Sequence, residues 1–529
     1  MPPIQARPAA RVAVPPVETD PDIVGGYLED AAHYPGGAAV GVARPSSADE
    51  VAAIVGQGQP VLAVGAQSSL TGGATPAGGV VLSTARLQAL DVDAPGRRVR
   101  AGAGVTLAAL QERLAADGLW FPPVPTYLGA TVGGAVSTNA AGAATFKYGA
   151  VRPWVDALTV VLASGDVLEI ARGTVAADDA GFAIGTSRGE VRVPIAPLPL
   201  PDVPKRSAGY PLAAGMDLVD LFIGAEGTLG VVTDATLRVA PLAASTCWAF
   251  VPVADEPRAI ALAGELRAEA RRAWAGAADG LDIAAIEHLD RRSIAIVRED
   301  GVDRRLDITL PAGAAVVLLV QIELPPGRPD EALWDDLAAG VDGPATPLGR
   351  LCRVLARHGA LDDAEVALPG QVARAAAFVE LREAVPAGVN RRVAQAQAAI
   401  DPRISKTAAD MVVPFERFGD MMRECRRLFD GRGLDLAVWG HISDGNVHPN
   451  VIPRSAADVD QGLEAILELG RVVIGMGGCP LAEHGVGRNP VKQALLESLY
   501  GPRGIAAMRA VRRALDPAGL FARNVLFPA

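Results

Sequence analysis

The stretch Pro60-Val61-Leu62-Ala63-Val64-Gly65-Ala66-Gln67-Ser68-Ser69-Leu70-Thr71-Gly72-Gly73 joins a predicted strand directly to a glycine-rich loop. Two further glycine-rich segments follow it, Gly129 to Gly134 and Gly224 to Gly230. Each can bring bare backbone N–H groups and small hydroxyls against an anion such as a pyrophosphate. No GxGxxG opens a helix in a βαβ unit, so a Rossmann site is not expected. Three such loops, two of them directly after strands, favour one extended cofactor laid across a sheet.

The composition is that of a globular chain, and it argues against several kinds of partner. A chain of 529 residues exceeds one ordinary core, so we expect two domains or more. The net charge of −11, without a run rich in Lys and Arg, argues against nucleic acid or an anionic membrane as the main partner. The four cysteines form no CxxC and no iron–sulfur spacing, which is typical of buried thiols in a reducing compartment.

Two segments bear on the location of the protein. The N-terminus, through about Glu18, is rich in proline and has no continuous apolar run, so we expect a loose arm and not a signal peptide. The longest apolar run, around Ala314 to Val320, is far shorter than a membrane span. We therefore predict a cytoplasmic protein without a membrane span.

The first half of the chain alternates short predicted strands with brief helices, from about Pro35 to Pro241. Thr106 is the predicted cap of a helix that ends at Gly118. Ser164-Gly165-Asp166 is predicted to join the strands of a hairpin, 157–162 and 167–170. The stretch from Arg172 to Ser207 is rich in Gly, Pro and Asp, and we expect it to be irregular surface chain.

The second half has longer helical patterns. Residues 256–275 and 415–429 are predicted helices, and the second carries a stripe of core residues at spacings of three and four. A final helix is expected to stop at Asp516-Pro517.

A second informative stretch is Gly440-His441-Ile442-Ser443-Asp444-Gly445-Asn446-Val447-His448. Asp444-Gly445 is a type I′ turn signal between two β-prone runs, so we predict a two-residue turn that places His441 opposite His448. Directly opposed residues have Cβ atoms about 4.5–5.5 Å apart, which suits two imidazoles on one divalent metal. Glu483 would be a third ligand, and His484 beside it a base. The alternative is a chance or structural pair, but three of the six histidines of the chain lie in these two segments.

The glycine-rich segments resemble the flavin-binding fold of the vanillyl-alcohol oxidase superfamily. The first loop, followed by Gly79-Val80-Val81-Leu82-Ser83, looks like the pyrophosphate-binding segment of that family. Ala130 to Gly142, followed by Lys147-Tyr148-Gly149, resembles the segment that lines the flavin, and Gly224 to Val232 resembles the third signature.

The second half narrows the resemblance to one branch. Gly440 to His448, with Ala482-Glu483-His484-Gly485-Val486-Gly487, is similar to the D-2-hydroxyacid dehydrogenases, which include D-lactate, glycolate and D-2-hydroxyglutarate dehydrogenases. The resemblance spans about Tyr27 to Leu526. It implies an α+β fold, with a two-subdomain FAD-binding unit and an α+β cap, or substrate domain, built on an antiparallel sheet. The implied divisions are an N-terminal arm (1–35), the FAD-binding domain (36–243), the cap (244–475) and a C-terminal segment (476–529) that packs back on the FAD-binding domain.

The resemblance implies FAD bound along the three glycine-rich segments. The residues that it places at the cofactor are Gly65, Ala66, Gln67, Ser68, Ser69, Gly72, Gly73, Thr131, Gly133, Gly134, Ser137, Asn139, Glu226, Gly227, Val231 and Val232. Some branches attach the flavin through a histidine. None of these loops contains one, so we predict a non-covalent flavin.

The implied reaction is the oxidation of a D-2-hydroxy acid to the 2-oxo acid. His441, His448 and Glu483 would hold Zn²⁺ or Mn²⁺, which lowers the pKa of the 2-hydroxyl as a Lewis acid. His484 would remove the hydroxyl proton while the Cα hydride passes to the flavin. The family places carboxylate-binding cations at Arg382 and Lys406, and Asn450 is expected to bind substrate or orient the metal shell. The alternative for Arg382 and Lys406 is that both are solvated surface charges.

Three positions depart from the family's pattern. Ala66-Gln67 stand where many members have glycines, which adopt positive φ angles more readily. Pro386 stands where some 2-hydroxyglutarate-type members have a hydroxyl that contacts the substrate. Phe521-Ala522-Arg523-Asn524 replaces the usual Asn-Pro-Gly turn, so that a flavin contact there is lost or is remade by Asn524.

Other functions are open at the level of sequence. One alternative is an oxidase of the same superfamily that acts on a phenol or an ether-lipid precursor. A second is a flavin-binding subunit of a larger redox complex, and a third is a small-molecule binding protein without redox chemistry. The leading hypothesis needs a small 2-hydroxy acid, and an electron acceptor such as a quinone, a cytochrome or an electron-transfer flavoprotein. A homodimer is one assembly open to it.

Overall fold

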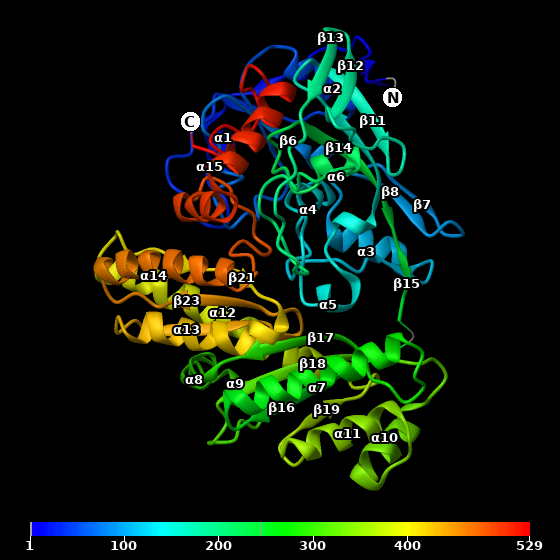
Figure 1. Cartoon of the computed structure of the whole chain (residues 1–529), viewed down its shortest axis with the longest axis vertical. Coiled ribbons are helices and arrows are strands. Elements are labelled where there is room, and N and C mark those ends of the chain that lie inside the picture. The colour runs from blue at the N-terminus through cyan, green and yellow to red at the C-terminus, as the bar shows by residue number, and fades with distance from the viewer. Residues whose placement is uncertain (1–2, 244, 529) are drawn as a thin grey trace.

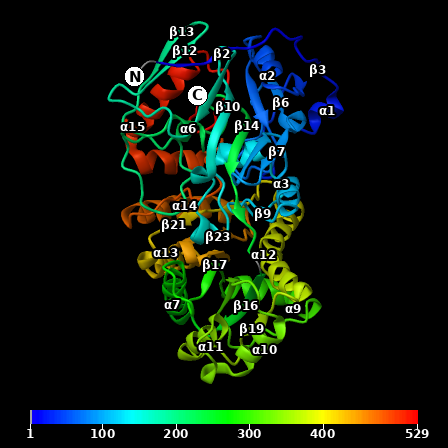
Figure 2. The ribbon, with the colours of Figure 1, turned by 90° about the vertical axis from the view of Figure 1, so that its right-hand side faces the viewer.

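The computed structural model describes residues 3–243 and 245–528, which form an α+β fold drawn out along one axis (Figure 1). Both termini lie in one half with the smaller sheets, and the largest sheet lies in the other half. The view turned by 90° keeps this order, with α14 (Ala456–Gly475) and β23 (Asn446–Val451), a strand of the largest sheet, where the two halves meet (Figure 2). The expected α+β class is confirmed.

A four-stranded sheet in the order β3-β4-β6-β5 carries the first glycine-rich loop. Its strands are β3 (Val17–Glu18), β4 (Gly41–Ala43), β5 (Val61–Val64) and β6 (Val80–Ser83), and the last three are parallel. Parallel neighbours need a crossover, and α2 (Ala48–Val55) forms part of one; its N-cap Ser47 accepts the N–H of Glu50. The loop Gly65–Gly73 therefore starts at the carboxyl end of β5.

A six-stranded antiparallel sheet in the order β2-β11-β10-β14-β8-β7 lies beside it. Its strands are β2 (Arg7–Pro8), β7 (Leu90–Asp93), β8 (Arg98–Gly102), β10 (Val155–Val161), β11 (Asp166–Ala171) and β14 (Val231–Arg238). The predicted hairpin is confirmed, with Val161 opposite Val167. The predicted helix is confirmed as α3 (Leu107–Ala115), whose N-cap Thr106 accepts the N–H of Ala109.

The N-terminal arm is not loose, and the prediction was wrong on this point. Ile4–Gln5 (β1) pairs in parallel with β12 (Phe182–Thr186), β2 extends the six-stranded sheet, and β3 extends the four-stranded sheet. The segment 172–207 is also less irregular than expected, since β12 forms a hairpin with β13 (Gly189–Val193). Proline-rich sequence is compatible with short edge strands, where a missing N–H can face away from the ladder.

The largest sheet is antiparallel, in the order β19-β16-β18-β17-β22-β23-β20, with β21 also on β23. The strands are β16 (Ser245–Val253), β17 (Asp282–Leu289), β18 (Val316–Leu324), β19 (Glu365–Ala367), β20 (Thr407–Ala408), β21 (Met411–Val412) and β22 (Leu436–His441). The longest apolar run of the chain falls in β18. Val317 and Leu319 enter one core cluster while Leu318 and Val320 enter the other. This strand is apolar throughout because both of its faces are covered.

Helices cover both faces of this sheet. One face packs against α8 (Arg291–Glu299) and α12 (Val372–Ala399), and the other against α7 (Glu256–Trp274) and α13 (Phe418–Asp430). The predicted helices 256–275 and 415–429 are thus confirmed, the second with a short 3₁₀ turn at Phe415–Arg417. The remaining helices of this half are α9 (Val302–Arg305), α10 (Asp330–Ala338), η3 (Gly340–Asp342) and α11 (Pro347–Arg357).

The C-terminal segment returns to the first half of the chain. After α15 (Pro490–Leu515), the N–H of Val61 donates to the carbonyl of Leu520, and the N–H of Ala522 donates to the carbonyl of Val61. The exact domain boundaries stay predictions.

The first half also contains several short elements. They are α1 (Pro21–Gly25), η1 (Thr84–Arg86), β9 (Leu119–Trp120), α4 (Val132–Thr138), α5 (Thr145–Tyr148), η2 (Arg152–Trp154), α6 (Leu218–Phe222) and β15 (Ala240–Pro241). Among the described residues, no helix combines the length and apolar composition that crossing a bilayer requires.

Candidate active site

The two histidines of the hairpin come together, but by a different register from the predicted one. Residues 442–445 form the connection, a 3₁₀ turn (η5, Ile442–Asp444) followed by Gly445 at φ 78°. His441 therefore lies opposite Asn446, and Trp439 lies opposite His448. The predicted two-residue turn was wrong, because Asp444 is buried within the 3₁₀ turn and is paired with Lys205.

His441 and His448 still share one face of the sheet. His448 lies two residues beyond Asn446, the partner of His441, and alternate residues of a strand point to the same side. The centroids of the two rings are 5.5 Å apart, and the rings are arranged edge to face. The diagonal placement thus serves the same purpose as the predicted direct pairing.

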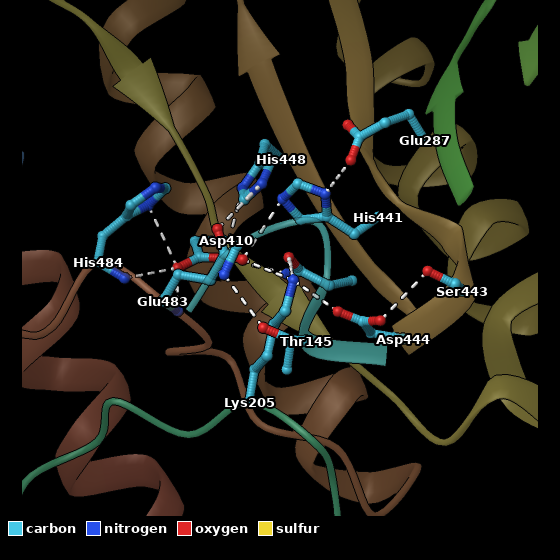
Figure 3. Close-up of polar contacts among 12 residues, drawn as sticks. Thr145, Lys205, Glu287, Asp410, His441, Ser443, Asp444, His448, Glu483 and His484 are labelled. Carbon is cyan, nitrogen blue, oxygen red and sulfur yellow. Dashed lines mark hydrogen bonds and ion pairs between the residues drawn. The ribbon is translucent and has the colours of Figure 1, made fainter. Parts of the chain in front are cut away.

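Glu483 meets both rings from the loop between α14 and α15 (Figure 3). Its Oε1 lies 3.4 Å from Nε2 of His441, and its Oε2 lies 3.5 Å from Nε2 of His448. A tetrahedral ion with bonds of about 2.1 Å has ligand atoms roughly 3.4 Å apart, so these separations fit Zn²⁺. The three side chains form one of two groups in the described residues whose donor atoms could hold a metal.

A carboxylate lies behind each of these rings, and sequence reasoning missed both carboxylates. Glu287 lies opposite His441 in the adjacent strand β17, and its Oε1 is 2.5 Å from Nδ1 of that ring. Asp410 lies 3.4 Å from Nδ1 of His448. Metal-ligating histidines usually donate their other ring N–H to a carboxylate, so the described residues fit a metal at the two Nε2 atoms.

Lys205 is a further residue that sequence reasoning missed. Its side chain is fully buried, and Nζ lies 2.6 Å from Oδ2 of Asp444 and 2.6 Å from Oε1 of Glu483. It comes from the irregular chain before α6, far in sequence from both carboxylates. Burial alone would raise the pKa of Glu483, but Lys205 and His441 hold that pKa well below its usual value. Glu483 is therefore ionised and able to act as a ligand.

Two of the three predicted substrate residues lie beside the histidine site, and the third does not. Arg382 is buried on α12 and binds Glu287 at 2.8 Å and Glu383 at 2.7 Å, so Glu287 connects it to His441. Asn450 is buried, and its Nδ2 donates to the backbone carbonyl of His448 at 3.0 Å. Lys406 is exposed and lines a separate small cavity of about 30 Å³, which Asp410 also lines.

One cavity of about 320 Å³ brings the three glycine-rich loops together. Of the predicted cofactor residues, those that line it are Gly65, Ala66, Gln67, Ser68, Ser69, Gly73, Thr131, Gly133, Gly134, Ser137, Glu226, Gly227, Val231 and Val232. Gly72 and Asn139 are not among its lining residues. The side chain of Asn139 instead accepts the N–H of Arg152 and donates to the carbonyl of Arg206.

The cavity wall requires glycine at several points. A Cβ on Gly65 would lie 2.3 Å from Oγ1 of Thr131, and one on Gly133 would lie 2.7 Å from Cβ of Ala103. Gln67 takes the positive φ of 53° that a glycine adopts more readily, and its amide donates to the carbonyl of Glu29 at 2.8 Å. A close-packed wall of bare backbone fits an extended phosphate-bearing cofactor.

His484 lies where the cavity meets the metal-ligand group. It lines the cavity together with Glu483, and its Nδ1 is 3.2 Å from Oδ2 of Asp410. Burial lowers the pKa of His484 below that of a free imidazole, so the ring is neutral at neutral pH. A neutral imidazole at this border can accept a proton.

Glu226 ties the loop that carries His484 to the third glycine-rich segment. Its two oxygens accept the N–H groups of Val486 and Gly487, each at 2.8 Å. Burial raises the pKa of Glu226 to about 7. Residues 521–524, which stand in place of the family's Asn-Pro-Gly turn, do not line the cavity. The backbone carbonyl of Asn524 accepts a hydrogen bond from the side-chain amide of Gln493.

Relatives of known name match nearly the whole chain. The D-lactate dehydrogenase of Archaeoglobus fulgidus is 27% identical over 92% of this chain and 90% of its own length. The glycolate oxidase subunit GlcD of Bacillus subtilis is 26% identical over 92% and 87%. The D-2-hydroxyglutarate dehydrogenase of Xanthomonas citri is 28% identical over 92% and 89%.

Structure and family comparisons agree on the fold. The solved 4-ethylphenol oxidase from Gulosibacter chungangensis superposes with a TM-score of 0.65 and 16% identity, over 97% of this chain and 94% of that chain. Residues 39–171 match the FAD binding domain family, and residues 263–525 match the C-terminal domain of FAD linked oxidases. The predicted resemblance is thereby confirmed: the chain belongs to the FAD-linked oxidases of the vanillyl-alcohol oxidase superfamily.

Proposed function

We propose that this enzyme oxidises a small D-2-hydroxy acid, such as D-lactate, glycolate or D-2-hydroxyglutarate, with FAD and a divalent metal. One observation carries the proposal: Glu483 and His484 line the cofactor cavity, and Glu483 also belongs to the metal-ligand group of His441 and His448. The flavin, the metal and the base would therefore lie together where the cavity adjoins the metal-ligand group. The names of the three relatives support the hydroxy-acid class.

The absent groups would supply two kinds of chemistry. FAD bound along the glycine-rich loops would accept a hydride from Cα, and Zn²⁺ or Mn²⁺ held by His441, His448 and Glu483 would lower the pKa of the 2-hydroxyl. We infer that the flavin is held without a covalent bond, because the glycine-rich loops contain no histidine. The remaining work belongs to side chains of this protein.

His484 is the proposed base. Its Nδ1 faces Asp410, which leaves Nε2 to take the hydroxyl proton. His484 lines the cavity together with the glycine-rich loops, and it adjoins the proposed metal ligand Glu483, which supports this role. The low pKa of the ring keeps it unprotonated before the reaction.

Arg382 is the proposed carboxylate-binding residue. Its guanidinium already has two carboxylate partners, Glu287 and Glu383. A substrate carboxylate would join this network and would do so beside Glu287, the residue that orients His441. Asn450 is buried on the same strand face as His448, and we assign it to substrate binding or to the metal shell. Lys406 stays a candidate on the resemblance alone.

A flavin-binding subunit of a larger redox complex is the second candidate function, since one relative is named as a subunit of glycolate oxidase. In either case the electrons must leave the flavin for a separate acceptor, and a quinone, a cytochrome or an electron-transfer flavoprotein is the expected class. A subunit that is inactive alone would lose its flavin colour with substrate but would not turn over with an artificial dye.

An anaerobic spectrum tests the proposal. The purified protein, supplied with FAD if necessary, is mixed separately with D-lactate, L-lactate, glycolate and D-2-hydroxyglutarate. We expect at least one D-acid or glycolate to bleach the visible band of oxidised flavin, L-lactate to have no effect, and chelation to abolish the bleaching. A flavoprotein that none of these acids bleaches would overturn the proposal.

A further inference from the structure

Asp410 faces two histidine rings and also binds the backbone of the loop that carries Glu483 and His484. This is more than the support of a single metal ligand requires. Asp410 is 2% exposed and lies between the short strands β20 and β21. Its Oδ1 is 3.4 Å from Nδ1 of His448, and its Oδ2 is 3.2 Å from Nδ1 of His484. Among the described residues, Nδ1 of His448 is buried and makes no hydrogen bond, and the carboxylate of Asp410 at 3.4 Å is the acidic group that it faces.

The same carboxylate also holds the backbone of the loop. Its Oδ2 accepts the N–H groups of Glu483 at 2.6 Å and of His484 at 3.0 Å. Its Oδ1 accepts Nδ2 of Asn446 at 3.1 Å. These contacts fix the orientation of the carboxylate independently of the two rings.

We propose that Asp410 is a positioning residue that orients two imidazoles with different tasks, the metal ligand His448 and the base His484. Both rings would then carry their proton on Nδ1, facing Asp410. The Nε2 atom of His448 is free to bind a metal, and that of His484 is free to accept the substrate proton. This inference rests on the proposed function, and it adds a physical coupling: one carboxylate links metal binding to the orientation of the base.

The contrast with Glu287 isolates this coupling. Glu287 also backs a proposed metal ligand, but it contacts only one ring, that of His441, and its other oxygen binds Arg382. Loss of Glu287 should weaken metal binding, and it should change the KM through Arg382. It should leave the orientation of the base His484 unchanged. Loss of Asp410 should affect the metal and the base together.

The experiment compares Asp410→Asn with Glu287→Gln. The Asn amide can keep its oxygen on the loop N–H groups and on Nδ1 of His484, and its NH₂ then places a donor near Nδ1 of His448. The negative charge that would stabilise a protonated His484 is lost. The ring of His448 would then turn to the other tautomer, with the proton on Nε2. We expect both variants to bind Mn²⁺ or Zn²⁺ about 10–100-fold more weakly, measured by competition with a chromophoric chelator, and to keep their FAD.

The limiting rate of flavin reduction at saturating metal and substrate separates the two variants. Glu287→Gln should return to within a few-fold of the wild-type rate. Asp410→Asn should stay slower by about 10²-fold or more, because His484 has no carboxylate beside it to stabilise the proton it accepts. Wild-type metal affinity in Asp410→Asn, or recovery of its limiting rate alongside that of Glu287→Gln, would overturn the proposal.

Nuclear magnetic resonance of the wild-type holoenzyme covers the case in which Asp410→Asn does not fold. The chain has only six histidines, so ¹⁵N-labelled imidazoles can be assigned with single-histidine variants. We expect Nδ1–H tautomers for His448 and His484; an Nε2–H tautomer for His484 contradicts the inference. Metal affinity and tautomer are read without turnover, so failure of the hydroxy-acid proposal would be seen separately, as a wild-type flavin that no acid bleaches.

Discussion

At the scale of single residues, the charge of His441 depends on the two carboxylates that face its ring. Burial alone would lower its pKa, but the carboxylates of Glu287 and Glu483 outweigh burial and raise the pKa to about 9. Burial would raise the pKa of Glu287, yet His441 and Arg382 bring it down to about 2. Without a metal, His441 is therefore a cation at neutral pH.

Metal binding at His441 should thus be a competition with a proton. Because the proton is bound below about pH 9, we expect metal affinity to rise about tenfold per pH unit between about pH 6 and pH 8. Calorimetry in buffers with different ionisation heats should show about one proton released per metal bound at neutral pH. Glu287→Gln should reduce this proton release, and an affinity that does not depend on pH contradicts the assignment.

His484 provides the second test at this scale. We expect His484→Gln to slow flavin reduction by about 10²–10⁴-fold, because the hydroxyl proton has no acceptor, while FAD and metal contents stay unchanged. Stopped-flow absorbance measures the rate, and elemental analysis measures the metal. His33→Gln is the matched control, since His33 is an exposed histidine that does not line the cavity. A rate within a few-fold of wild type would assign the proton transfer to another group.

At the scale of elements, the hairpin β22–β23 illustrates what local sequence can and cannot predict. The strands and their connection follow from β-prone runs on either side of Asp444-Gly445. Their register does not, because Asp444 is drawn into a buried pair with Lys205, a residue more than 200 positions earlier in the chain. The three glycine-rich loops do line one cavity, and a wall of bare backbone leaves a local glycine signal in the sequence.

The residues that support the site could not be found in this way. Glu287 and Asp410 stand alone in segments with no motif of their own, and they reach His441 and His448 only through strand pairing across the large sheet. Three-dimensional proximity between distant segments leaves no local spacing signal. The candidate metal ligands and base were predicted from the histidine pattern and from the resemblance, and the carboxylates beside them were missed for this reason.

Lys205 gives a prediction for the irregular segment before α6. Lys205→Met leaves the buried carboxylates of Asp444 and Glu483 without their cation, and removing one partner of a buried ion pair typically costs about 3–5 kcal/mol. We expect a lower thermal midpoint in the metal-free protein and a larger rise on adding metal than wild type shows, because the metal neutralises Glu483.

Arg206→Met is the control for this substitution. Arg206 is the neighbouring residue, and its guanidinium donates to a local carbonyl, that of Pro201, and to no carboxylate in the described parts of the chain. We expect little change in the thermal midpoint of this variant. Equal midpoints for Lys205→Met and wild type would show that the buried ion pair does not hold the segment in place.

At the scale of the whole molecule, the N-terminal arm connects sheets that are otherwise separate. Its three short strands add to three different sheets, and ion pairs join Arg7 to Asp49 at 2.9 Å and Glu18 to Arg44 at 2.5 Å. Deleting residues 1–18 should lower the thermal midpoint by several degrees and increase light scattering on heating, because strand edges become unpaired.

Two exposed residues within the arm provide the control. Val12 and Val14 lie between the strands and are 41% and 44% exposed, so replacing both with serine should leave the thermal midpoint near that of wild type. A deletion as stable as the full chain would show that the strand pairing contributes little.

The central claim for the whole enzyme is that cofactor, metal and base act together at the border between the cavity and the metal-ligand group. The most direct test of this claim is the rate of flavin reduction by the hydroxy acid that bleaches the flavin. The rate is measured on one preparation, first loaded with metal, then after chelation, and then with the metal restored. We expect fast reduction in the metal-loaded protein, a rate lower by about 10²-fold or more after chelation, and recovery when Zn²⁺ or Mn²⁺ is restored. An unchanged rate in protein shown by elemental analysis to be free of metal would contradict the claim.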